Sequence, residues 1–304
     1  MRLRTLLLAL APTSLLAAQT PTPAPLNWWD EDSARIAFVR ANSQPRVYPH
    51  LVLLAPTDSL DPGWLPAFAD SLAAALEALR SLLQAPHPWQ RIGLRPVVVV
   101  LAPGRFISHA TGHDTVLIAL RRVRQGAAPF LHEAAHELLA PPIPFAPYEY
   151  ADTLLGERKA AAFPVWLKEG LPDYVAQAVV QTTGFREGDV FEVGGLGKVD
   201  STCRARLTGH PSRAAIEAKI GGQGRLEALF TSDRETVAPT YYACSQSFTK
   251  YLVSRIGLPA LVALFPAIPS GRWALDLEAQ TGAPLSMLRH AWLAEIHTPD
   301  DSAP

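Results

Sequence analysis

Residues 132–136 read His-Glu-Ala-Ala-His, and this pentad restricts the local fold more than any other part of the sequence. In an α-helix, residues i and i+4 lie on one face, so His132 and His136 can direct two imidazoles at one metal ion. Glu133 lies one position further round the helix, where its carboxylate can take a proton from metal-bound water. Apolar helix formers flank the pentad and a proline pair follows, which predicts a helix over residues 127–140. The alternative is a buried helix that carries two histidines on one stripe.

A catalytic zinc ion needs a third protein ligand, because such sites use three protein ligands and leave one position open. The sequence predicts a second helix over residues 164–181, with Glu169 in its second turn beside the apolar face. Asp173 follows at i+4, where its carboxylate can accept the second ring N–H of a ligand histidine, with His132 the first choice. The alternative places both acidic residues on the exposed face of an amphipathic helix.

The pentad and the second helix together carry a resemblance to a known family. The second helix reads Trp-x-x-Glu-Gly-x-x-x-Tyr from Trp166 to Tyr174. With the pentad, this pattern resembles the gluzincin zinc metallopeptidases, in particular the peptidase-MA-like family, over roughly residues 95–265. The resemblance implies that the two histidines and Glu169 bind Zn²⁺ and that Glu133 is the general base. The interval between the motifs is longer than in thermolysin-like members, and Pro172 is unusual in the second helix.

Adjacent tyrosines begin a further predicted helix over residues 240–256. Related peptidases place a tyrosine at such a position, where its phenol donates a hydrogen bond to the oxyanion of the tetrahedral intermediate. Tyr242 is the first choice and Tyr241 the second, since neighbours on a helix point in different directions. Either ring can instead be a packed aromatic side chain with a satisfied hydroxyl.

The N-terminus has the pattern of a secretory signal over residues 1–18, with two arginines, an apolar run over residues 5–16 and small residues before a cleavage point after Ala18. An uncleaved anchor is the alternative. Residues 19–29 are rich in proline and predict a linker. We therefore expect a secreted or periplasmic protein without stable membrane insertion after removal of the signal.

Charge argues against a nucleic-acid partner, because the formal net charge is −1 and the basic residues are dispersed. The exception is a small cluster just before the pentad, made of Arg121, Arg122 and Arg124. Such a cluster is usually a solvated face. The resemblance implies a substrate-gripping edge strand at this place, where one arginine can meet a peptide carboxylate.

Cysteine and histidine offer two further candidate pairs. Cys203 and Cys244 can form a disulfide in an oxidising compartment, although their spacing does not show that they meet. His109 and His113 also stand four residues apart, but Gly112 and a following strand pattern favour a loop over a second metal site.

Strand patterns precede helix patterns along the chain, which predicts an α+β fold. We expect an N-terminal sheet lobe followed by a mostly helical lobe, zincin-like with an active-site helix and with a cleft between the lobes. The first lobe spans residues 30–125 and includes the edge strand, and the helical catalytic lobe spans residues 126–298. Predicted strands cover residues 34–39, 46–55, 94–102 and 115–123. Predicted helices cover residues 64–83, 127–140, 164–181, 211–231, 240–256, 258–266 and 284–296.

These features favour an exported zinc-dependent metallopeptidase that hydrolyses peptides or proteins by metal-activated water. The alternative is a catalytically inactive zinc-binding exported protein that uses the same fold for recognition. The sequence contains no Gly-x-Met-Glu-Asn segment of the kind that recognises a free amino terminus in related aminopeptidases. This mildly favours an endopeptidase or an unusual exopeptidase.

Overall fold

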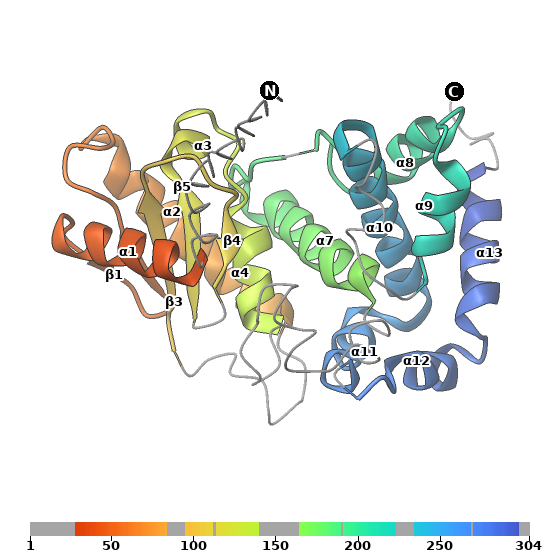
Figure 1. Cartoon of the computed structure of the whole chain (residues 1–304). Helices are drawn as coiled ribbons and strands as arrows, with labels where there is room; N and C mark the ends of the chain where they lie inside the picture. Colours follow the sequence, from red (N-terminus) through yellow and green to blue (C-terminus); the bar gives the residue numbers. More distant parts are fainter. Residues whose placement is uncertain are drawn as a thin grey trace, which may run out of the picture.

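The computed structural model describes residues 28–83, 95–111, 114–139, 164–189, 191–222, 234–268 and 270–297. The predicted signal, most of the predicted linker, His113 and the middle of the interval between the two motifs lie outside these ranges. The architecture is α+β, with a mixed five-stranded sheet and a mostly helical part. Figure 1 shows the sheet on one side, the later helices on the other, and α4 and α7 between them.

The sheet has the strand order β1-β2-β3-β5-β4. Its centre is formed by the parallel strands β2 (Leu51–Leu54), β3 (Val97–Ala102) and β5 (Thr115–Ala119). Two-residue antiparallel strands flank them, β1 (Arg46–Val47) beside β2 and β4 (His109–Ala110) beside β5. The central strands are apolar on both faces, as expected for parallel strands covered on both sides.

Alternate residues of β3 contribute to two separate cores. Val97, Val99 and Leu101 join the large core that includes helix α2 (Trp64–Leu83). Their neighbours in the strand join a smaller core that contains Val39 of helix α1 (Trp28–Ala41). Because side chains alternate along a strand, α1 and α2 cover opposite faces of the sheet.

The predicted strand over residues 34–39 is wrong, because these residues belong to α1. Ile36 and Val39 are three residues apart and pack on the sheet from one helical stripe. Arg35 donates to Asp32 at 3.0 Å and to Glu31 at 2.6 Å, at the i,i+3 and i,i+4 spacings that stabilise a helix. Packing on the sheet and these ion pairs therefore outweigh the intrinsic preference of these residues for a strand.

The strand predicted over residues 115–123 is shorter, because β5 ends at Ala119 and helix α3 (Leu120–Arg124) follows. The expected edge strand before the pentad is thus an internal strand, and the described sheet has β4 at this edge. The arginine cluster lies on α3, where Arg121 donates to the Phe106 carbonyl and Arg124 to the Ser59 carbonyl.

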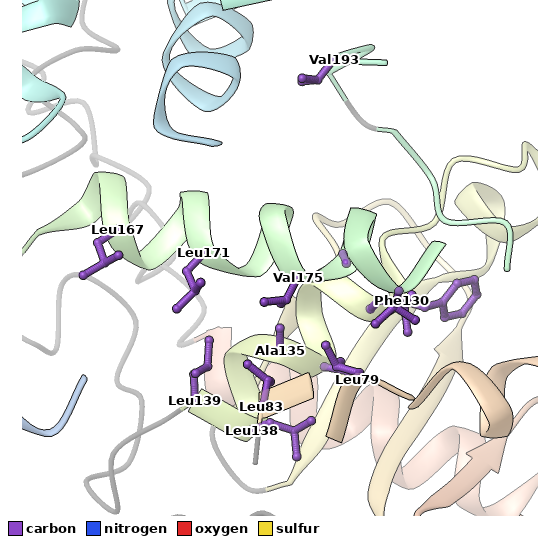
Figure 2. Close-up of a cluster of buried hydrophobic side chains, with 14 of the residues drawn as sticks. Leu79, Leu83, Phe130, Ala135, Leu138, Leu139, Leu167, Leu171, Val175 and Val193 are labelled. Atoms are coloured by element: carbon purple, nitrogen blue, oxygen red, sulfur yellow. The ribbon is translucent and has the colours of Figure 1, made fainter. Parts of the chain in front are cut away.

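Helices α4 (Phe130–Leu139) and α7 (Val165–Thr183) pack on each other and on α2. Figure 2 shows Leu171 and Val175 pointing from α7 toward the α4 side chains, with Leu79 of α2 close to them. All these side chains belong to the large core. Helix α7 continues through Pro172 to Thr183, so the proline does not end it.

The remaining helices form the second half of the molecule. They are α8 (Val199–Leu207), α9 (Arg213–Lys219), α10 (Arg234–Ile256), α11 (Leu258–Val262), the 3-10 turn η2 (Phe265–Ala267), α12 (Trp273–Thr281) and α13 (Leu285–His297). Helices α8 and α12 were not predicted, α9 ends well before residue 231, and α10 begins before the predicted residue 240. The sequence left the Cys203–Cys244 pair open, and the structure joins it in a buried disulfide between α8 and α10.

Within the described ranges, no single helix has the length and apolar composition of a membrane span. One pair of segments, Thr236–Ile256 and Leu258–Ala267, meets both criteria together, with a bend of 115° between them.

Candidate metal centre

Three side chains from two helices converge where the sequence places a metal site. His132 and His136 extend from the same face of α4, and Glu169 extends from α7. The two Nε2 atoms lie 3.1 Å apart, and each lies 3.6–3.7 Å from Oε2 of Glu169. One possible ligand atom from each residue therefore lies within 4.8 Å of the other two.

These separations fit a tetrahedral zinc ion. Ligand atoms at about 2.1 Å from such an ion lie roughly 3.4 Å from one another, and the three observed distances bracket that value. Two imidazole nitrogens and one carboxylate oxygen are also a donor set that zinc accepts. His136 and Glu169 are buried and His132 is nearly so, so the residues present fit a zinc ion.

Asp173 lies one turn beyond Glu169 on α7 and holds the first histidine. Nδ1 of His132 donates to Oδ1 of Asp173 at 2.6 Å, so Nε2 is the ring nitrogen that faces the cluster and that could bind a metal ion after loss of its proton. Burial opposes the charged form of His132, but the charge and hydrogen bond of Asp173, together with the charges of Glu133 and Glu169, raise the pKa of this imidazole to about 10. Gln246 of α10 donates to the Asp173 carbonyl at 3.3 Å and so ties a third helix to this position.

The other two members of the cluster also have shifted pKa values. Burial lowers the pKa of His136 to about 4, which keeps this imidazole neutral. Burial opposes the charged form of Glu169, yet His136, Lys168 and His132 together hold its pKa well below the ordinary value. Glu169 is thus ionised and His136 neutral, which are the states in which a carboxylate oxygen and an imidazole nitrogen bind a metal ion.

Glu133 is buried beside the cluster and is held by the sheet. Its Oε2 accepts the backbone N–H of Ala110 in β4 at 3.1 Å. Burial raises the pKa of Glu133 to about 7, with Glu169 adding to the rise and His132 and His109 opposing it. The carboxylate therefore lies between the histidine pair on α4 and the edge strand of the described sheet.

The two tyrosines of α10 have different surroundings. Tyr241 is buried, and its pKa is raised by burial and by Glu169 while a hydrogen bond with Ser245 opposes the rise. The pKa of Tyr242 is raised by burial and by the carboxylates of Glu169, Asp173 and Glu133. The charges of three site carboxylates thus act on Tyr242, whose ring centre lies 4.4 Å from that of Phe191.

Glu187 is a residue that the sequence reasoning missed. It follows α7, yet its carboxylate accepts the backbone N–H groups of Leu131 at 2.8 Å and His132 at 3.0 Å. Burial raises the pKa of Glu187 to about 8, while these two hydrogen bonds lower it. The side chain caps the first turn of α4 and so fixes the helix that carries the pentad. An isolated glutamate far along the chain gave no local signal for this contact.

No protein-family model matches the sequence, and no curated protein matches it. Among solved structures, the chain is similar to a mutant M1 zinc metallopeptidase from Deinococcus radiodurans, crystallised with a Tyr-Ser-Ala substrate. The sequence identity is 16% and the TM-score 0.42, over 83% of this chain and 50% of that one. The chain thus spans half the length of that peptidase.

Proposed function

We propose that this chain is a zinc-dependent metallopeptidase of the gluzincin type. The observation that carries the proposal is the convergence of His132, His136 and Glu169 within 4.8 Å, with Glu133 directly beside the first ligand. When bound, zinc supplies Lewis acidity, which polarises a substrate carbonyl and acidifies water. A zincin-like arrangement, with α4 as the active-site helix, follows from this assignment.

The general base in this proposal is Glu133. Its carboxylate takes a proton from the attacking water and later delivers that proton to the departing amine. The hydrogen bond from Ala110 holds one of its oxygens, which limits the orientations that the carboxylate can adopt. A purely structural metal site has no need of such a base, and this favours the peptidase over an inactive metal-binding protein.

Two further side chains support the reaction in different ways. Tyr242 is the proposed hydrogen-bond donor to the negative oxygen of the tetrahedral intermediate, because three site carboxylates raise the pKa of its phenol, whereas Glu169 is the one site carboxylate that raises that of Tyr241. Asp173 fixes the tautomer and ring orientation of His132 through the 2.6 Å contact. An extended peptide beside β4 would bring its scissile bond toward Glu133, because this strand lies at the edge of the described sheet and contacts the base.

We further propose that the protein is exported to the periplasm or the medium. Support comes from the signal-like pattern of residues 1–18 and from the buried Cys203–Cys244 disulfide, since disulfides persist in oxidising compartments.

The test combines metal analysis with hydrolysis of an unfolded protein such as casein. Glu133→Gln is expected to keep one zinc ion per chain, because the ligands are intact, while hydrolysis falls by about 10²–10⁴-fold. Glu169→Ala is expected to lose zinc. Glu217→Gln is the matched control, since this residue forms an ion pair with Arg213 on α9, and it should leave both properties unchanged.

Two outcomes would count against the proposal. A protein that binds no zinc at micromolar concentration would contradict the metal site itself. A protein that binds zinc yet cleaves nothing in a broad peptide library would favour the inactive, recognition-type alternative.

A further inference from the structure

Strand β4 contacts the proposed general base and contains only two residues. It pairs with β5 through only two residue pairs, His109 with Leu117 and Ala110 with Val116. The residues beside it add two hydrogen bonds to β5, because the Thr111 N–H donates to the Thr115 carbonyl at 2.8 Å and the Ala119 N–H donates to Oγ of Ser108 at 3.1 Å. A short strand at a sheet edge still has few ladder hydrogen bonds, so its position also depends on contacts of its side chains. One such contact is made by the His109 side chain.

The ring of His109 joins β4 to α1 on the far side of the sheet. Nε2 lies 2.7 Å from Oδ2 of Asp32, and Nδ1 lies 2.8 Å from the carbonyl oxygen of Ile107. Both neighbours are acceptors, so both ring nitrogens donate and the ring is an imidazolium. Burial opposes this charge, but the hydrogen bonds to Asp32 and Ile107 outweigh it and raise the pKa of His109.

Asp32 is itself fixed, which makes it a firm anchor. Its carboxylate is buried, and its other oxygen accepts from Arg35 at 3.0 Å. The guanidinium of Arg35 also lies 4.9 Å from the centre of the Phe106 ring, close to the start of β4. Charge-assisted hydrogen bonds that are shielded from water are among the stronger polar contacts in proteins.

The anchored residue adjoins the group that orients the base. Ala110 follows His109, and its N–H donates to Oε2 of Glu133. The carboxylate of Glu133 also interacts with the charges of His132, Glu169, His109 and Arg122. Since both nitrogens of the His109 ring already donate to Asp32 and Ile107, the ring makes no hydrogen bond to Glu133 and acts on it through the position of β4 as well as through its charge.

We propose that His109 is a positioning residue for Glu133, because its ion pair with Asp32 fastens β4 to α1 and thereby aims the Ala110 N–H at the carboxylate of the base. The catalytic consequence rests on the proposed function, since that function makes Glu133 the base. The structural coupling between α1, β4 and Glu133 can be measured without any activity.

The first measurement is amide hydrogen exchange at Ala110 in the full chain, read by NMR. His109→Asn and Asp32→Asn are each expected to speed this exchange by about tenfold or more, because β4 loses its anchor. His50→Asn is the matched control, since His50 forms a similar 3.0 Å pair with Glu77 away from the site. Unchanged exchange at Ala110 in both variants would overturn the proposal.

The second measurement is casein hydrolysis by zinc-loaded protein. His109→Asn and Asp32→Asn should each lower kcat by about tenfold at unchanged KM and zinc content, and the double variant should be no slower than either single one. His109→Gln, which keeps a donor toward Asp32, should recover part of kcat, and it decides the question if His109→Asn does not fold. Full kcat in all these variants would refute the positioning role. A wild-type chain without activity would refute the proposed function, while the exchange measurement would still decide the coupling.

Discussion

The contact between α7 and α10 allows a prediction of stability from geometry, because Gly170 lies where the two helices meet. A Cβ at this position would lie 2.4 Å from the carbonyl oxygen of Ser245 and 2.6 Å from Oγ1 of Thr249. Carbon contacts are optimal at about 3.5–4.0 Å, so Gly170→Ala would place its methyl group about 1 Å too close to α10. The nearest atoms are backbone atoms of a helix, which cannot rotate away.

The cost of this substitution follows from the general cost of overpacking. Extra atoms in a packed core cost about 1–3 kcal/mol, and the backbone contact places Gly170→Ala at the upper end, about 3 kcal/mol. For a domain of this size, about 2–4 °C is lost per kcal/mol, so the melting temperature should fall by roughly 6 °C or more. Helix α10 also carries Tyr242, so we expect hydrolysis to fall even where the protein remains folded.

The assay is thermal and denaturant unfolding of the variant beside a matched glycine variant. Gly197→Ala is suitable, because a Cβ there would meet no atom within 4 Å and the residue does not have a positive φ. This control should change the free energy of unfolding by less than about 0.5 kcal/mol. If the two variants unfold at the same temperature, the close approach of α7 and α10 is not as described and the reasoning fails.

Four further predictions concern residues around the site. Asp173→Asn should lower zinc affinity by about 10–100-fold in a chelator competition, because the ligand histidine loses its carboxylate partner, and wild-type affinity would contradict this. Replacing Cys203 and Cys244 by serine should lower the free energy of unfolding by about 4 kcal/mol for a loop of this length, and an unchanged denaturation midpoint would argue against the linkage. Glu187→Ala should cost about 1–2 kcal/mol in unfolding experiments, since two helix N–H groups lose their acceptor, and a neutral effect would refute the cap. The pKa of His109 is raised on folding. The stability advantage of wild type over His109→Asn should therefore be fully present below about pH 6.5 and decline as the pH rises through the folded pKa. An advantage that grows with pH would be inconsistent with an imidazolium.

Part of the geometry of the His132–His136–Glu169 cluster could be anticipated, because the spacing of residues within each helix is local. The spacing of His132 and His136 specifies one helical face, and the position of Glu169 on a second amphipathic helix specifies its inward direction. What the sequence could not specify was the meeting of the two helices, which depends on packing between residues far apart in the chain. The resemblance to a peptidase family provided that link as an expectation.

The contacts that orient the site were harder to anticipate, since each joins segments distant in sequence. Glu187 reaches back to α4 across 55 residues, and Asp32 reaches His109 across 77. Strand β4 contains two residues and has no periodicity to detect. The strand predicted over residues 34–39 failed for a related reason, because a short apolar run does not distinguish a strand from one stripe of a helix.

The length of α7 sets the separation between Glu169 and Glu187, which both contact α4. Glu169 lies near one end of this helix, and beyond its other end, where Gly184 turns the chain with φ 70°, Glu187 docks on the start of α4. One residue added within α7 would turn its far end by about 100° and shift it by about 1.5 Å. Either Glu169 or Glu187 would then move away from its contact with α4, so the site depends on the length of this helix as well as on the chemistry of its residues.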